Sequence, residues 1–100
     1  MIFTTCKDEA EARSLARALV EKKLAACVNI LPNMGSIYMW EGEVAEATEA
    51  KLLIKTKADK MNDVFLTIKE LHSYEVPEIQ VVEVSTGNLA YFNWMDEVLN

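Results

Sequence analysis

Several residue types that carry chemistry are scarce in this sequence. Its 100 residues include one histidine and two cysteines, and Cys6 and Cys27 are too far apart to form a Cys-x-x-Cys pair. A structural zinc site usually needs four cysteine or histidine ligands, so none is expected within one chain. A Gly-rich phosphate-binding loop, a nucleophile elbow and a His-Glu-x-x-His motif are also missing. We therefore do not expect an enzyme.

Basic residues are outnumbered by acidic ones. Sixteen aspartates and glutamates against ten lysines and arginines give a formal net charge of -6. Repulsion from phosphate backbones and anionic lipids argues against nucleic acid and membranes as partners. No run approaches the roughly 18 apolar residues that would span a bilayer. Residues 1–5 lack the basic and apolar blocks of a signal peptide, and we expect a cytoplasmic protein.

Apolar residues are abundant, at 51% of the chain. This is enough to build one core, and the length is that of a single domain over residues 1–100. Extended apolar patterns predict strands at residues 2–5, 25–31, 36–40, 43–56 and 78–84. Pro32 and Gly35 end or bend the chain between the second and third of these. Glu41 and Gly42 are expected to form the two-residue turn of a hairpin.

Apolar residues spaced three and four apart predict three helices. They cover residues 8–22, 56–71 and 89–99. Asp8 has the character of an N-cap, and Glu11 is its reciprocal partner three residues later. Pro77 disfavours helix at Val76 and so limits the second helix. The resulting order, β-α-β-β-α-β with a short C-terminal helix, is the split βαβ or ferredoxin-like arrangement of an α+β protein.

The predicted hairpin is too long for its own helices. A helix of about 15 residues spans roughly 22 Å, whereas a strand of about 14 residues spans roughly 46 Å. The outer part of the hairpin carries Ile37, Tyr38, Met39, Trp40 and Val44. So much apolar surface favours a closed homo-oligomer in which neighbouring hairpins shield one another. The alternative is a hairpin curled back on its own sheet.

Blocks of this sequence resemble the CutA family of divalent-cation tolerance proteins. The blocks are LAACVNI at 24–30, SIYMWEG at 36–42, LLIKT at 52–56, HSYEVPEI at 72–79 and YFNW at 91–94. They occur in the family's order and span nearly the whole chain. The resemblance implies a ferredoxin-like subunit in a tight homotrimer, with an architecture similar to the PII signalling proteins. It also implies a link to tolerance of copper and other divalent metals.

Cys6, His72, Glu75 and Glu78 are the candidate ligands for a weakly bound Cu²⁺ or another divalent cation, because thiolate, imidazole and carboxylate groups suit such ions. Cys6 precedes the first predicted helix, whose N-terminus could lower the pKa of its thiol. His72 could instead be a surface or interface histidine near a helix end. Members of the family commonly have His-Pro-Tyr where this chain has His72, Ser73 and Tyr74.

A second group of residues is expected to line clefts between subunits. Lys55 could bind a small anion there or pair with a carboxylate, and the other members are Trp40, Glu41, Tyr74 and Cys27. Packing is the alternative role for Cys27, which we expect on a central strand, and for the aromatic residues. These features lead to two hypotheses. The first is a homotrimer in divalent-metal tolerance that acts by weak cation binding or indirectly, and the second is a PII-like regulatory module that binds a small ligand or a partner protein.

Overall fold

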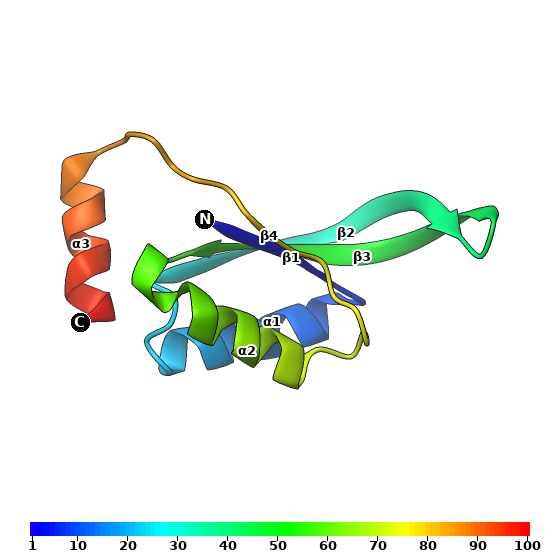
Figure 1. Ribbon diagram of the computed structural model, residues 1–100, viewed down its shortest axis with the longest axis horizontal. Helices are drawn as coiled ribbons and strands as arrows, with labels where there is room; N and C mark the ends of the chain where they lie inside the picture. Colours follow the sequence, from blue (N-terminus) through cyan, green and yellow to red (C-terminus); the bar gives the residue numbers. More distant parts are fainter.

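The computed structural model describes residues 1–100, and its helices and strands follow the predicted order (Figure 1). The strands are β1 (Ile2–Cys6), β2 (Cys27–Trp40), β3 (Glu43–Lys55) and β4 (Ile79–Val81). The helices are α1 (Glu9–Glu21), α2 (Met61–Leu71) and α3 (Leu89–Leu99), and a short 3-10 turn, Ala58–Lys60, precedes α2. None of these helices combines the length and the apolar character needed to cross a bilayer.

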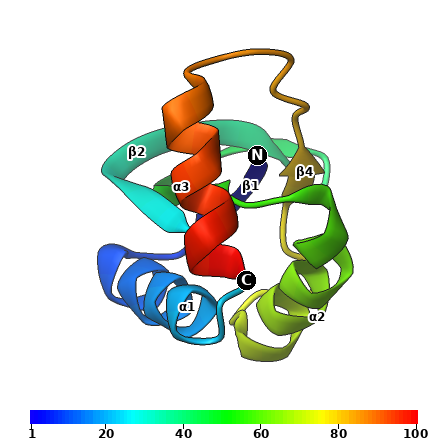
Figure 2. The same cartoon turned by 90° about the vertical axis from the view of Figure 1, so that its left-hand side faces the viewer.

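The four strands form one antiparallel sheet in the order β2-β3-β1-β4. Helices α1 and α2 lie against the same face of this sheet, and α3 stands at one end of the molecule (Figure 2). The prediction of a ferredoxin-like α+β fold is confirmed. The expectation that Cys27 lies on a central strand is wrong, because β1 pairs with β3 and leaves β2 at the edge.

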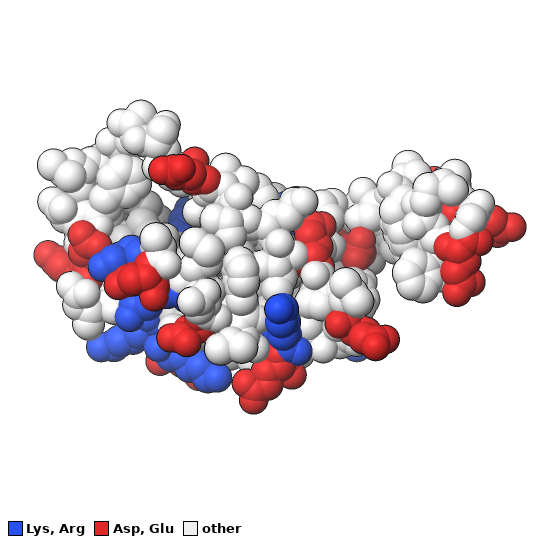
Figure 3. All heavy atoms as spheres, in the orientation of Figure 1, with Lys and Arg blue, Asp and Glu red and all other residues white.

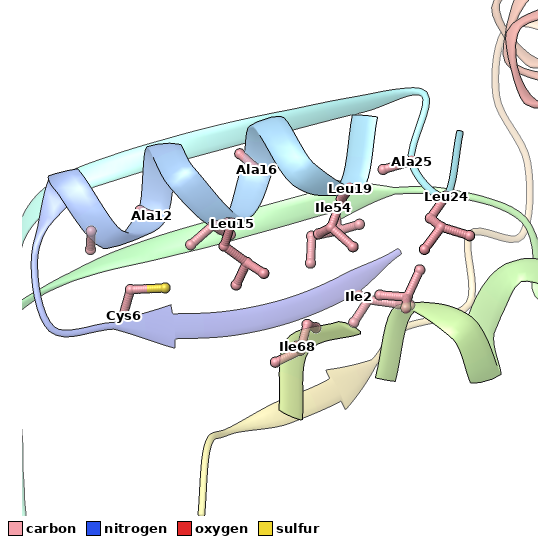
Figure 4. Packing of buried hydrophobic residues seen from close by; sticks show 13 residues of the cluster. Ile2, Cys6, Ala12, Leu15, Ala16, Leu19, Leu24, Ala25, Ile54 and Ile68 are labelled. Carbon is pink, nitrogen blue, oxygen red and sulfur yellow. The ribbon is translucent and has the colours of Figure 1, made fainter. Parts of the chain in front are cut away.

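A core of buried side chains fills the space between the sheet and the two helices (Figure 4). Leu15 and Leu19 of α1 are 2% and 0% exposed, and Ile54 of β3 and Ile68 of α2 are 0% exposed. Cys6, at the end of β1, is buried in the same cluster. The helical spacing in α1 and the alternation in β3 are the patterns that predicted this layer.

The hairpin formed by β2 and β3 pairs from Cys27 opposite Lys55 to Trp40 opposite Glu43. Its turn uses two residues with positive φ, Glu41 at 50° and Gly42 at 82°, which is the backbone that two-residue hairpin turns require. The bend predicted near Pro32 is an irregularity in the ladder between Leu31 and Met34. A bulge in an outer strand tolerates proline, so β2 bends and continues instead of ending.

The last strand is shorter than the predicted stretch 78–84, because β4 ends at Val81. It pairs with β1 only over Ile2–Thr4. Met1 and Val82 exchange two further hydrogen bonds of 2.8 Å. Beyond Val82 no other strand of the subunit lies alongside, and residues 83–87 take part in no backbone hydrogen bond. This segment runs in an extended path to α3 (Figure 1).

The distal half of the hairpin projects beyond both helices, as predicted (Figure 1). The molecule measures 46 × 26 × 21 Å along its principal axes. The five apolar residues of the projecting part, which we call the tip, are between 44% and 72% exposed: Ile37, Tyr38, Met39, Trp40 and Val44. The alternative of a hairpin curled back on its own sheet is therefore wrong for this subunit.

Candidate functional site

Cys6, Glu11 and His72 form the one group of possible metal ligands that the fold brings together. Their sulfur, carboxylate and imidazole atoms all lie within 4.8 Å of one another. They come from the end of β1, the first turn of α1 and the residue that follows α2. The predicted ligands Glu75 and Glu78 are not part of this group. Glu75 is exposed, while Glu78 accepts a 3.2 Å hydrogen bond from Thr5 Oγ1 and lies 3.7 Å from Lys51 Nζ.

The side chain of His72 is fully buried within the subunit, so it is not the surface histidine that the sequence also allowed. Its Nε2 atom lies 2.8 Å from the carbonyl oxygen of Thr5. A carbonyl can only accept, so Nε2 must carry the proton and donate. The backbone N–H of Tyr74 donates to Nδ1 over 3.0 Å. The imidazole is therefore neutral, and both of its nitrogens are already hydrogen-bonded.

Glu11 is the member of the cluster that the sequence analysis assigned only to a helix cap. The predicted N-cap is present, because the Glu11 N–H donates to Asp8 Oδ1 over 2.9 Å, but the reciprocal bond from the Asp8 N–H to the Glu11 carboxylate is not formed. Its carboxylate accepts from the backbone N–H of Lys7 over 3.2 Å and from that of Ser73 over 3.1 Å. Burial acts to raise the pKa of Glu11, but the hydrogen bonds from Ser73 and Lys7 lower it overall. The capping pattern was the signal that pointed to this residue.

The lowered pKa of Glu11 makes its contribution to stability depend on pH. Stabilisation is present above the unfolded value of 4.5 and is lost as the pH falls through the lower folded value. We expect Glu11→Gln to lower the free energy of unfolding by about 1–3 kcal/mol at neutral pH, and the difference from the parent to shrink below pH 4.5. Urea unfolding at fixed protein concentration measures both. Glu9→Gln is the matched control, because Glu9 is exposed and pairs only with Arg13, so its effect should stay within about 0.5 kcal/mol. Equal losses for the two variants would contradict the prediction.

The expectation of an activated Cys6 thiol is wrong. Burial, followed by the negative charge of Glu11, raises the pKa of Cys6 from 9.0 to about 12. The helix N-terminus does not offset this, because the first turn of α1 places carboxylates beside the sulfur. Cys6 therefore behaves as a small apolar core residue and stays protonated at neutral pH.

This burial predicts an unreactive thiol. In a Cys27→Ser variant, where Cys6 is the only cysteine, alkylation by iodoacetamide at pH 8 should be slowed about 1,000-fold relative to the denatured chain, since only the thiolate reacts. Mass spectrometry over a time course, with and without guanidinium, measures the two rates. A native rate within tenfold of the denatured rate, in a variant that remains folded by circular dichroism, would show that the sulfur is accessible.

Tyr74 connects the cluster to the hairpin. Its hydroxyl donates to Glu49 Oε2 of β3 over 2.8 Å, and its ring lies 4.9 Å from the His72 ring between centroids. Burial, and then the carboxylate of Glu49, raise the pKa of Tyr74 well above its ordinary value of 10.0. The phenol therefore stays protonated and keeps donating to Glu49 through the neutral range.

The chemistry of this donor set does not fit a divalent cation. A copper or zinc ligand must offer a free lone pair, and cysteine must lose its proton first. Here the lone pair of His72 Nδ1 accepts from Tyr74, and the Cys6 thiol holds its proton. The only buried side-chain oxygen or nitrogen atom without a partner is Thr4 Oγ1, so the cluster has no unsatisfied nitrogen or carboxylate for an ion to complete.

The residues expected in a cleft between subunits lie far apart within one subunit. Trp40 and Glu41 are at the tip, with Trp40 64% exposed. Lys55 and the half-buried Cys27 face each other at the opposite end of the hairpin. Tyr74 lies between these two ends. A second copy of the chain would be needed to bring the tip to Lys55.

Lys55 lines an apolar groove at that opposite end. The groove has a volume of about 760 Å³ and lies between residue Met1, the segment 81–84 and α3. Lys55 Nζ lies 5.9 Å from the centre of the Tyr91 ring, and Lys57 forms a 3.1 Å ion pair with Asp96. Sequence reasoning named Lys55 but missed the groove, because α3 returns to β3 only in the folded chain.

Fold and site together define the class of protein: a small ferredoxin-like subunit with a hairpin longer than its helices. The family model described as CutA1 divalent ion tolerance protein matches residues 1–98. The chain belongs to the CutA family.

Related proteins agree with this assignment. The divalent-cation tolerance protein CutA of Thermus thermophilus is 44% identical over 97 residues, which are 97% of this chain and 94% of that protein. The protein CutA of Homo sapiens is 41% identical over 96 residues, and the CutA homologue of Xenopus laevis is 39% identical over 97. These alignments cover 96% and 97% of this chain, but only 54% of the human protein and 64% of the frog protein.

Solved structures show the same fold. The CutA1 protein of Thermus thermophilus superposes with a TM-score of 0.90 at 45% identity, covering 93% of this chain and 90% of that one. A protein from Archaeoglobus fulgidus, described as a periplasmic divalent cation tolerance protein CutA, gives 0.95 at 38% identity, covering 99% and 96%. The proteins of Thermus thermophilus and Archaeoglobus fulgidus are named for tolerance of divalent cations and not for a reaction, in keeping with the expectation that the chain is not an enzyme.

Proposed function

We propose that the chain acts as a homotrimer in the response to divalent metal ions, copper foremost, and that tolerance depends on the assembled trimer. The carrying observation is the excess of exposed surface. The subunit exposes 6633 Å², whereas a compact protein of its mass exposes about 5,700 Å². The excess of roughly 900 Å² is close to the area that each partner contributes to a standard interface, about 800 Å².

Two backbone edges support a head-to-tail arrangement. The outer edge of β2 has no strand beside it, and residues 83–87 are extended without backbone partners. An extended segment adds readily to the open edge of a sheet. Because the two edges lie on different parts of the subunit, each copy would use one edge on each of its neighbours. Such contacts close into a ring when the rotation between copies allows it.

Charge supports the same pairing. The tip region carries Glu41, Glu43 and Glu46, and residues 34–46 contain no lysine or arginine. Figure 3 shows acidic side chains gathered on the projecting hairpin, with the basic side chains over the rest of the molecule. The groove is lined by Lys55 and Lys57 and also by Glu83 and Asp96. Lys57 is paired with Asp96, so Lys55 is the lysine of the groove without an ion pair inside the subunit. A glutamate of the acidic, apolar tip of one copy could therefore pair with Lys55 in the groove of the next.

Sedimentation equilibrium at micromolar concentration tests this proposal. We expect a particle of three times the chain's 11.3 kDa mass. A well-folded particle of 11.3 kDa over the same concentrations would overturn it.

The role of the cation is part of the proposal. Since the buried cluster does not offer free donors, we propose that copper or another divalent ion binds the trimer weakly or acts on it indirectly. Calorimetry with Cu(II) and Zn(II) should then show no tight stoichiometric site.

The proposal also includes a cytoplasmic location, which the two free cysteines support.

A PII-like regulatory module is the second candidate, and the groove beside Lys55 is the observation that favours it. A lysine at the wall of an apolar groove suits a small anionic ligand. Such a ligand would bind between subunits, where the neighbouring tip completes the groove. A thermal-shift screen of nucleotides and simple anions tests this candidate, with Lys55→Gln as the variant that should lose any response. An absence of shifts across the screen would count against it.

A further inference from the structure

The cluster around His72 joins three segments that are distant in the sequence: residues 5–11, residue Glu49 and residues 72–74. Glu11 of α1 accepts from Lys7, which follows β1, and from Ser73, which follows α2. His72 donates to Thr5 of β1. Tyr74 reaches Glu49 of β3. The sheet, the first helix and the turn after the second helix are therefore connected through a few side chains.

The point of contact on β3 is the base of the projecting hairpin. Glu49 pairs with Met34, which is the first pair beyond the bulge at Leu31. From this point the hairpin extends away from the helices. Tyr74 holds Glu49 at this base. A small change in the angle between the hairpin and the rest of the sheet at this point would move the tip by a large distance.

We infer that Glu11, His72 and Tyr74 form a hydrogen-bonded brace, which fixes the turn at residues 72–74 against the base of the hairpin, and that this cluster is not a divalent-cation site. Each group has the role that its chemistry allows. The Glu11 carboxylate serves two backbone donors, the neutral imidazole bridges a carbonyl and an amide, and the phenol donates to a carboxylate.

The residue at position 73 is part of the brace through its backbone. Ser73 supplies the N–H that meets Glu11 Oε2. A proline at this position has no N–H and could not make the bond. In this chain the turn at residues 72–74 is therefore fixed to α1 by the hydrogen bond between the Ser73 N–H and Glu11.

Nuclear magnetic resonance of the ¹⁵N-labelled full-length protein tests the inference directly, because His72 is the only histidine. At pH 7.5 its ring should be the neutral tautomer with the proton on Nε2, and one equivalent of Zn(II) should leave the ring signals unchanged. A saturable Zn(II)-induced shift of these signals that Cys6→Ser abolishes would overturn the inference. Binding detected by calorimetry without any change at His72 would lie elsewhere and would agree with it.

Amide hydrogen exchange tests the brace itself. In Glu11→Gln the amide group presents an NH₂ where one backbone N–H needs an acceptor, so exchange at Ser73 or Lys7 should accelerate about tenfold or more. Glu9→Gln, on the exposed side of the same turn, should leave both rates within about twofold. Equal rates at both amides in the two variants would show that Glu11 holds nothing in place. The oligomer proposal is decided by mass in solution, so the two ideas can fail separately.

Discussion

Replacing Leu52 with alanine is expected to lower the free energy of unfolding by about 2–5 kcal/mol. Leu52 lies on β3 and is 0% exposed within a core of only 13 buried residues. A single domain of this size has about 5–15 kcal/mol of stability in total. The expected fall in melting temperature is about 10–30 °C, and calorimetry at fixed protein concentration measures it.

Leu66→Ala provides the matched control for this prediction. Leu66 is on α2 but is 65% exposed, so the same atoms are removed without leaving a cavity. Its effect should stay within about 0.5 kcal/mol. If the two variants lost similar stability, the side chains between sheet and helices would not be the main source of the fold's stability.

Introducing a charge at the tip by Met39→Asp is expected to abolish assembly at micromolar concentration. Met39 is 65% exposed in the subunit, so an aspartate there costs the isolated chain little. Within an interface the carboxylate would lose water without gaining a partner, which should weaken association on the order of 1,000-fold or more. Sedimentation should give the mass of one chain, with a circular dichroism spectrum like that of the parent.

The control for the tip is Ser14→Asp, which adds the same charge on the exposed face of α1. This variant should keep the mass of the parent. A Met39→Asp protein that retained three chains would place the tip outside the interface and would remove the main physical argument for the proposed trimer.

Much of the fold followed from local patterns. The spacing of Leu15 and Leu19 predicted the buried face of α1, and the pair Glu41 and Gly42 predicted the hairpin turn. These features depend on residues close in sequence, whose geometry the backbone dictates. The end of β4 was predicted three residues too late, because a strand ends where its partner does, and the partner is β1.

The candidate site was predicted less completely. Cys6 and His72 lie together in the subunit, but Glu75 and Glu78 are not part of their cluster, and Glu11, which is, was assigned to a cap alone. A spacing of three residues has no fixed meaning in an irregular turn, so His72 and Glu75 need not face the same way. The pKa of the Cys6 thiol was expected to be lowered by the helix N-terminus, but it is raised. The expectation left out burial and the carboxylates in the first turn of the same helix.

The sequence by itself determined the order of helices and strands and a hairpin too long for its helices, since both follow from periodicity and from a fixed rise per residue. It also determined the charge of the tip. Only the tertiary structure decided that His72 is buried and neutral. The reason is that its partner Thr5 is 67 positions away in the sequence. The burial and the protonation state of a side chain depend on the groups that long-range packing places beside it.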